Sequence, residues 1–149
     1  MPTKKNQKSY YSGKKKRHTL KSQIIVDQKS KRIISTAFAS GKKHDLRLFK
    51  ESGNYIHKDI LTLIDTGYIG IDKIHAHSIL PAKKSKNRPL TNEDKKWNRE
   101  ISSVRVLCEN VIGMLKRYKI LSERYRNQRK RFDLRFNLIA GFYNYELVP

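Results

Sequence analysis

The clearest pattern in the chain is an almost continuous apolar run at residues 60–64, which ends abruptly in Asp65, Thr66 and Gly67. A short run of this kind is typical of a strand that is covered on both faces of a sheet. Asp65 then lies at the carboxyl end of the strand, where ligands and catalytic groups gather in open α/β sheets. A carboxylate at this position suits a divalent metal ion, although these residues by themselves also fit a simple turn.

Alternation and helical spacing predict the shorter elements. Segments rich in Ile, Val, Thr and Phe predict strands at 19–27 and 32–39, and the polar residues between them predict a hairpin turn. Short helices are expected at 45–52 and 69–76. A short strand is expected at 78–82, where Pro81 and a basic loop at 83–88 stop it.

The strongest single prediction is a long helix at residues 90–118. Thr91 is placed to cap it, and Glu93 and Asp94 put negative charge in the first turn, where the helix dipole favours it. One apolar stripe at helical spacing is expected to lie on the sheet: Trp97, Ile101, Val104, Cys108, Val111 and Leu115. A second stripe, about 100° around the helix, contains Asn98, Ser102, Arg105, Glu109 and Lys116.

Glu109 borders the apolar stripe and is therefore expected to reach over the end of the sheet toward Asp65, away from bulk solvent. The alternative is an ordinary ion pair with Arg105 one turn earlier. A last helix is expected at about 128–145. Its core face carries Phe132, Phe136, Ile139 and Tyr143.

Composition narrows the function classes. The 149 residues suit one domain. Lysine and arginine total 34 against 13 acidic residues, a formal net charge of +21 that favours a nucleic-acid partner without choosing between DNA and RNA. The single cysteine, Cys108, excludes an intramolecular disulfide and a multi-cysteine zinc site. No signal peptide or membrane-length apolar run is present, which predicts a soluble cytoplasmic protein that does not act on membranes.

The basic residues fall in segments. Residues 1–17 are expected to form a flexible basic arm ahead of a folded region at 18–149, with tyrosines suited to stacking on bases. The cations at 124–131 oppose the dipole of the following helix, so a bound phosphate backbone explains them better than helix stability does. His75 and His77 have no third ligand at a useful spacing and are interpreted as ordinary surface histidines.

Several motifs together carry a family resemblance. They are Tyr-Tyr-Ser-Gly-Lys-Lys-Lys-Arg-His-Thr at 10–19, His44-Asp45, Asp-Thr-Gly-Tyr-Ile-Gly at 65–70, Arg-Val-Leu-Cys-Glu-Asn-Val-Ile-Gly at 105–113, Tyr-Arg-Asn at 125–127 and Asn-Leu-Ile-Ala-Gly-Phe-Tyr-Asn at 137–144. In combination they resemble the DDE-superfamily transposases of bacterial insertion sequences. The resemblance covers nearly the whole chain, and the combination is more specific than any one motif.

The resemblance implies an α/β fold with a ribonuclease-H-like mixed sheet and flanking helices. It implies a two-metal site for Mg²⁺ or Mn²⁺, in which Asp65 is the second aspartate and Glu109 is the glutamate. In that family the metals activate water to nick DNA and then activate the freed 3′ hydroxyl for strand transfer. Cations expected to face the DNA of the insertion-sequence ends and the target are Lys14, Lys15, Lys16, Arg17, Lys83, Lys84, Arg88, Arg105, Lys116, Arg126, Arg129 and Arg131.

The chain departs from the family pattern at its start. The family's first aspartate lies on a strand before the motif at 10–19, and residues 1–9 contain no carboxylate. Asp27 cannot replace it, because the hairpin turn is at the far end of the sheet. We therefore expect a truncated or frameshifted C-terminal portion that lacks the first, central strand. Such a chain is expected to be inactive and marginally folded unless an upstream transposase polypeptide or further copies complete it.

Two alternatives remain open from the residues. A non-catalytic basic nucleic-acid-binding protein would satisfy the size and charge of the chain. The second alternative combines the transposase and binding-protein hypotheses. It is a remnant that binds DNA or a full-length transposase and so interferes with transposition. Convergence of Asp65 and Glu109 separates the catalytic reading from simple binding.

Overall fold

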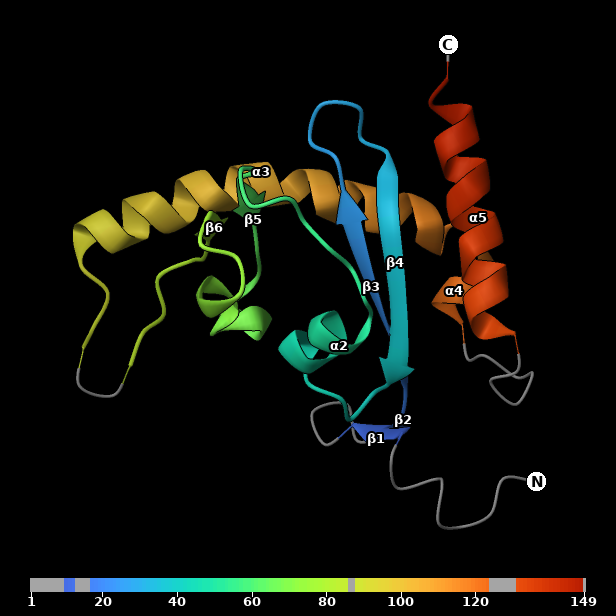
Figure 1. The fold of residues 1–149 in the computed structure, drawn as a ribbon, viewed down its shortest axis with the longest axis horizontal. Helices are drawn as coiled ribbons and strands as arrows, with labels where there is room; N and C mark the ends of the chain where they lie inside the picture. The colour runs from blue at the N-terminus through green and yellow to red at the C-terminus, as the bar shows by residue number, and fades with distance from the viewer. Residues whose placement is uncertain (1–9, 13–16, 86–87, 124–130, 149) are drawn as a thin grey trace.

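A β-hairpin lies at the centre of the computed structural model, which describes residues 10–12, 17–85, 88–123 and 131–148 (Figure 1). Strands β3 (Leu20–Val26) and β4 (Ile33–Ser40) pair antiparallel along their whole length. The Asp27 carboxylate closes the turn by accepting hydrogen bonds from the Ser30 amide and hydroxyl at 2.7 and 2.6 Å. The predicted hairpin is therefore confirmed.

Two further strand pairs are separate from the hairpin. β1 (Tyr11–Ser12) pairs with β2 (Arg17–His18), and β5 (Thr62–Leu63) pairs parallel with β6 (Ser78–Ile79). The strands expected at 60–64 and 78–82 are present but shorter than predicted. In the described part of the chain, β5 has a ladder on one edge only, so little backbone pairing extends it. The fold is a mixed α/β arrangement of small sheets and helices.

The short helices follow the prediction in part. Helix α2 (Asp45–Glu51) forms as expected. The helix expected at 69–76 is wrong: that range contains only the short 3₁₀ turn η3 (Ile71–Lys73), and another 3₁₀ turn, η2 (Thr66–Tyr68), precedes it. Gly70 lies between them with a φ of 93°, a left-handed conformation that ends one turn and begins the next.

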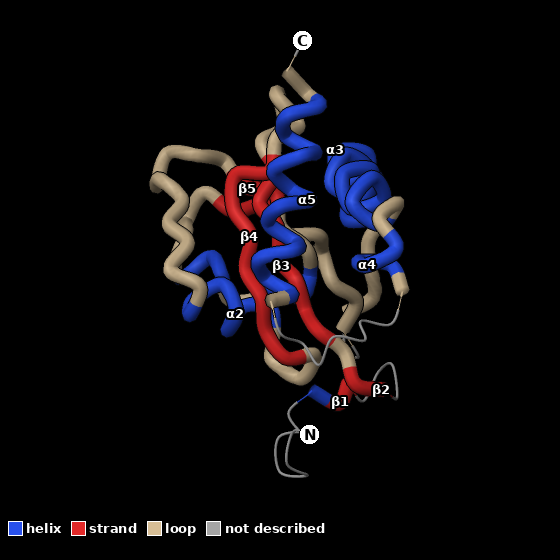
Figure 2. Tube along the Cα trace, turned by 90° about the vertical axis from the view of Figure 1, so that its right-hand side faces the viewer, coloured by secondary structure: helices blue, strands red, loops and turns tan. Residues whose placement is uncertain are grey.

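The predicted long helix is confirmed as α3 (Asn92–Lys116). A capping box starts it, because the Thr91 hydroxyl accepts from the Asp94 amide while the Asp94 carboxylate accepts from the Thr91 amide, both at 3.0 Å. After α4 (Lys119–Ser122), helix α5 (Phe132–Glu146) runs along the hairpin, and α3 lies beside it (Figure 2). Residues 128–131 of the expected last helix lie outside α5, and 128–130 are outside the described residues.

The hairpin has a hydrophobic cluster on each face. On one face, Ile24 and Val26 pack with buried residues from β4, α3 and α5: Ile33, Val111, Leu115, Phe136, Ile139, Ala140 and Tyr143. On the other face, Ile25 packs with Phe49, Ile64 and Ile71. This alternation follows from the two-residue period of a strand. The predicted core face of the last helix is confirmed for Phe136, Ile139 and Tyr143, and Phe132 is partly buried.

The apolar stripe of α3 is only partly covered. Ile101, Val111 and Leu115 are buried, as expected. Val104 is 38% exposed and Cys108 is also exposed, although both lie between buried residues on the same face of the helix. We call Val104 and Cys108 the uncovered stretch of α3. The expectation that the whole stripe lies on the sheet is wrong here, and at Trp97, because the described residues place nothing opposite them.

Two asparagines tie α5 to β4. The Asn144 amide accepts from the Ile33 N–H and donates to the Ile33 carbonyl, both at 2.8 Å. Nearer the start of α5, the Asn137 side-chain oxygen accepts a hydrogen bond from the Thr36 hydroxyl at 2.6 Å. Since Asn144 satisfies both backbone groups of a buried residue, it fixes how α5 lies along the strand.

We expect Asn144→Ala to lower the free energy of unfolding by about 2 kcal/mol, because it leaves the Ile33 N–H and carbonyl without partners. Chemical denaturation measures this change. Asn110→Ala, at an exposed position of α3, is the control and should change stability by less than about 0.5 kcal/mol. Equal losses in the two variants would show that the Asn144 contacts do not hold α5 in place.

Candidate active site

Asp65 follows β5 directly and is held by the next residue. Its Oδ1 atom accepts from the Thr66 backbone N–H at 2.6 Å and from the Thr66 hydroxyl at 3.2 Å, which caps η2. The side chain is about half exposed, at 53%. Because one oxygen is fixed by this cap, the other, Oδ2, is directed toward helix α3.

Arg105 on α3 meets Asp65 and Glu109 with a single nitrogen atom. Its Nη2 lies 3.4 Å from Asp65 Oδ2 and 3.9 Å from Glu109 Oε1. Asp65 and Arg105 are 40 residues apart in sequence, so the fold alone creates this contact. The sequence offered an ion pair between Arg105 and Glu109 as one of two interpretations. The structure contains this pair, and the same Arg105 nitrogen also contacts Asp65.

One expectation about Glu109 is wrong. Sequence spacing placed this side chain at the border of the buried face, away from bulk solvent, and the structure leaves it 67% exposed. The cause is the uncovered stretch of α3, which includes the neighbouring Cys108. Where nothing packs on the middle of the helix, a residue at the border of the stripe faces solvent.

A further carboxylate, that of Asp45, lies close to the 3₁₀ turn that follows Asp65. Asp45, the first residue of α2, pairs with Lys21 Nζ at 2.9 Å. A side-chain carbon at Gly67 would come within 2.5 Å of Asp45 Oδ2, so only glycine leaves room for this carboxylate. Burial, Asp45 and Asp65 together raise the pKa of Tyr68 to about 12. Sequence reasoning missed this role of Asp45, and its only signal was the pair His44-Asp45 in the family resemblance.

The expected DNA-facing cations are spread over several elements. Lys83, Lys84 and Arg88 are exposed on the loop after β6, which Asn98 fastens to α3 by hydrogen bonds of 2.7 and 2.9 Å to the Ala82 backbone. Lys116 is exposed at the end of α3.

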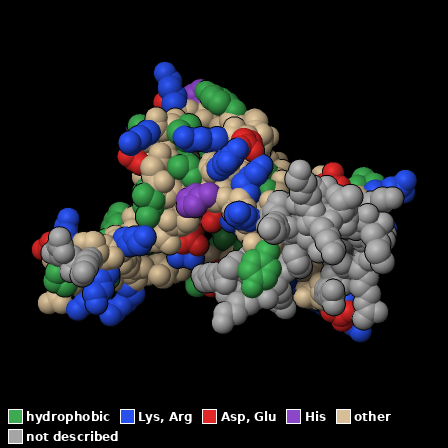
Figure 3. Space-filling view, turned by 90° about the horizontal axis from the view of Figure 1, so that it is seen from below, with side chains coloured by type: hydrophobic (Ala, Val, Ile, Leu, Met, Phe, Trp, Pro, Cys, Tyr) green, Lys and Arg blue, Asp and Glu red, His purple; other side chains and the backbone are tan. Residues whose placement is uncertain are grey.

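The other expected cations lie away from that loop. Arg131 is exposed just before α5, and only the backbone of Arg17 is described, in β2. Five of the expected cations lie outside the described residues: Lys14, Lys15, Lys16, Arg126 and Arg129. On the face seen in Figure 3, lysine and arginine outnumber carboxylates among the charged side chains.

The interpretation of His75 as a surface histidine is wrong. This residue is 5% exposed, and its Nε2 lies 2.7 Å from the Ile60 carbonyl and 3.2 Å from the Thr62 hydroxyl. His77 is exposed, as expected. His75 therefore joins the segment after η3 to the start of β5, a structural role that the two-residue spacing of the histidines did not reveal.

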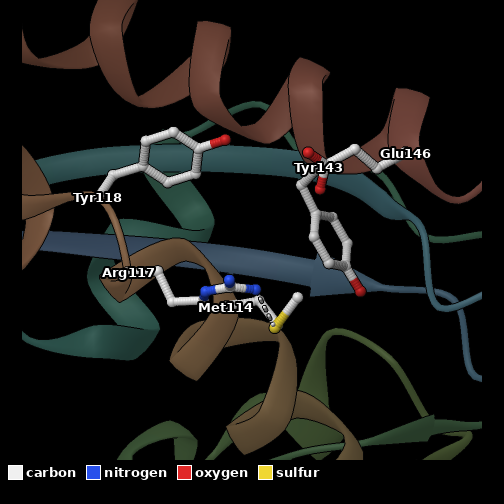
Figure 4. A pocket seen from close by; sticks show the side chains of 5 residues that line it. All are labelled: Met114, Arg117, Tyr118, Tyr143 and Glu146. Carbon is white, nitrogen blue, oxygen red and sulfur yellow. Dashed lines mark hydrogen bonds between the residues drawn. The ribbon is translucent and has the colours of Figure 1, made fainter.

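A cavity of about 300 Å³ lies elsewhere, between the end of α3 and α5 (Figure 4). It is lined by Met114, Arg117, Tyr118, Tyr143 and Glu146. Asp65, Arg105 and Glu109 do not line it, and their side chains are 53%, 33% and 67% exposed, so their meeting point is open to solvent. An open surface suits a large polymeric ligand better than an enclosed small molecule.

Comparison with known proteins identifies the family. A family model described as DDE superfamily endonuclease matches residues 1–144. The chain belongs to this family. The resemblance found from the motifs is thereby confirmed, and members of the DDE superfamily generally depend on divalent metal ions.

A curated relative agrees with this assignment. The chain is 48% identical over 145 residues to a protein described as "Probable transposase for insertion sequence element IS702" from Microchaete diplosiphon. The match covers 97% of this chain and 52% of the relative, so the chain spans about half the length of the curated relative. No solved structure matches the chain significantly. No helix in the described part of the chain is long and apolar enough to cross a membrane.

The donor chemistry at Arg105 fits the metal dependence of DDE endonucleases. Asp65 and Glu109 offer carboxylate oxygens, the hard ligands that Mg²⁺ and Mn²⁺ prefer. Among the described residues, however, no group of three or more histidine, cysteine or acidic side chains is arranged to hold a metal ion. The described chain therefore contributes a pair of candidate ligands.

We expect Tyr68 to titrate near pH 12, later than an ordinary tyrosine with a pKa of 10.0. The folded state keeps this phenol neutral, so the stability that it contributes is intact below pH 10 and is lost as the pH rises toward about 12. Nuclear magnetic resonance of labelled tyrosine, with Tyr68→Phe to assign the signal, measures the pKa directly.

Asp45→Asn and Asp65→Asn should each lower the Tyr68 pKa, because each removes a negative charge that opposes ionisation. Ionisation of Tyr68 near its ordinary pKa of 10.0 would contradict the burial of the phenol beside two carboxylates.

Proposed function

We propose that this chain is the larger part of a ribonuclease-H-like catalytic domain of a DNA transposase, in which Asp65 and Glu109 hold divalent metal ions. The observation that supports it most is the meeting of both carboxylates at Arg105 Nη2, from a sheet edge and a helix remote in sequence. Bound Mg²⁺ or Mn²⁺ would supply an activated water and then an activated 3′ hydroxyl for in-line attack on phosphodiester bonds.

The chain's own residues fix the ligands and hold the DNA. Thr66 orients the Asp65 carboxylate, and the rigid helix α3 carries Glu109. Lys83 and Lys84 lie exposed on the loop after β6, and Lys116 lies exposed at the end of α3. Together with the other proposed DNA-facing cations, they would neutralise phosphates of the insertion-sequence ends and the target DNA. The release of counterions from those phosphates favours DNA binding. We place this activity in the bacterial cytoplasm.

We further propose that a strand from outside these 149 residues lies between β3 and β5 and brings the third carboxylate. In the described part of the chain, β3 pairs only with β4 and β5 pairs only with β6, so each has an edge without a strand partner. The uncovered stretch of α3 needs a partner of the kind that a central strand provides. The greater length of the curated relative is consistent with a further segment.

Under this proposal, ligands from two polypeptide segments form the metal site. With two carboxylates at Arg105, residues 1–149 alone would hold metal weakly and would not cleave DNA. An upstream transposase polypeptide is the partner that we propose, and assembly of several copies is a second way to complete the site. The net charge of +21 also supports a competing function, non-catalytic binding of nucleic acid, in which Asp65 and Glu109 have no part.

We expect residues 1–149 to show no Mg²⁺-dependent nicking of insertion-sequence DNA, and to gain it when the upstream half of a related transposase is added. Asp65→Ala or Glu109→Ala should abolish the gained nicking, by at least about a hundredfold, because each removes a metal ligand. Electrophoresis of supercoiled plasmid DNA measures the nicks, and Asp59→Ala, at an exposed position outside the site, is the control.

Two results would oppose the catalytic proposal. Nicking that survives Asp65→Ala would remove Asp65 from the metal site. DNA binding that persists in chelator, with no nicking under any combination, would favour the non-catalytic alternative.

Docking of the proposed strand can be followed at Cys108, the single cysteine of the chain. Cys108 is exposed in the uncovered stretch of α3, so a maleimide reagent should label it in residues 1–149 alone. We expect the upstream half to slow labelling by about tenfold or more, because a strand over α3 removes the thiol from solvent. Mass spectrometry measures the rate.

A matched control for this labelling places the cysteine elsewhere. In Cys108→Ala combined with Ser103→Cys, on an exposed part of α3, the upstream half should leave the rate within about twofold. Unchanged labelling of Cys108, under conditions in which nicking is gained, would show that the strand does not cover this stretch of α3.

A further inference from the structure

Arg105 lies where a cation bound by both carboxylates would lie. Its Nη2 atom is the only described cation in contact with Asp65 or Glu109, at 3.4 and 3.9 Å. Asp65 and Glu109 would hold a divalent metal ion through these same carboxylate groups. The guanidinium and the metal would then occupy overlapping space, and their like charges would repel each other.

The contact is also loose. A strong charge-assisted hydrogen bond between a guanidinium and a carboxylate measures about 2.7 to 2.9 Å, and both distances here are longer. The Arg105 side chain is 33% exposed, so it has a route to solvent that requires no movement of α3. Asp65 Oδ1 is already engaged by Thr66, which leaves Oδ2 to whichever cation is present.

We propose that Arg105 is a displaceable counter-ion, which offsets part of the negative charge of Asp65 and Glu109 in the metal-free protein and is expelled when a divalent metal ion binds. This inference rests on the proposed function, because it takes the two carboxylates as metal ligands. It adds a regulatory step: metal affinity is set partly by the cost of removing the guanidinium. Arg105 thus lowers the metal affinity of the two carboxylates whose charge it partly offsets.

Expulsion also gives Arg105 a second partner. Once displaced on the open surface, its guanidinium is available to a DNA phosphate, for which its planar fork is well suited. Any anion that takes Arg105 away from Asp65 favours metal binding, and the metal favours the anion by the same factor. Metal and phosphate are therefore expected to bind cooperatively through this one side chain.

The test is direct binding of Mn²⁺ to residues 1–149 in the absence of DNA. Electron paramagnetic resonance measures the affinity. Arg105→Gln should tighten Mn²⁺ binding by about tenfold, since it removes a competing positive charge within 4 Å of the ligands. Arg99→Gln is the matched control, because it makes the same change of charge at an exposed position on α3. It should change the affinity by less than about twofold.

Arg105→Lys keeps the charge and should leave the affinity within about threefold of the unchanged chain. Circular dichroism verifies folding of each variant, and if Arg105→Gln does not fold, the lysine variant and competition by guanidinium ions against Mn²⁺ take its place. In that competition, added methylguanidinium should weaken Mn²⁺ binding in the lysine variant more than equal NaCl does.

The outcomes separate this inference from the proposed function. If Asp65→Asn and Glu109→Gln each weaken Mn²⁺ binding but Arg105→Gln leaves it unchanged or weakens it, Arg105 is not a competitor and the metal site stands. If Mn²⁺ binds equally in all variants, or in none even after the upstream half of a related transposase is added, the metal assignment of Asp65 and Glu109 fails. Tightening in Arg105→Gln that Asp65→Asn reverses supports both.

Discussion

The anchoring of α3 near both of its ends, in the hairpin cluster and at the loop after β6, is the constraint on which the rest of the structure depends. A helix of 25 residues spans about 37 Å, long enough to lie across both strand pairs (Figure 1). Its C-terminal half enters the core with Val111 and Leu115, and Asn98 near its other end holds the loop after β6. Arg105 and Glu109 lie between these anchored ends, so the position of the proposed ligand pair is a consequence of packing.

Local patterns predicted the elements whose stability is local. The hairpin followed from two apolar strands and an Asp-containing turn, and α3 followed from its capping box and apolar spacing. The expected helix at 69–76 is reduced to the turn η3, and the only sign of this in the sequence was Gly70. A glycine can take a positive φ, but the sequence does not show that Gly70 does so. Burial of His75 depends on the Ile60 carbonyl, a contact between segments that spacing could not reveal.

The failures on α3 share one physical cause. A helical wheel reports which residues share a face, and burial depends on what lies opposite that face. Val104 is as well placed for burial as Val111, yet it is 38% exposed while Val111 is 2% exposed. Glu109 is exposed for the same reason. The family resemblance assigned roles to Asp65 and Glu109, whereas the position of Arg105 between them came from the three-dimensional structure alone.

An incomplete site with a loosely held arginine has a mechanistic logic under the proposed function. A nuclease that bound metal tightly whenever it folded would be free to cut any DNA held by its many cations. If the third carboxylate comes from a separate strand, and if Arg105 must leave before metal enters, cleavage requires assembly, metal and a phosphate together. Each requirement acts on the same few ångströms around Arg105 Nη2, where the two described carboxylates already meet. Control then arises from electrostatic competition at the site, with no need for a movement of the surrounding fold.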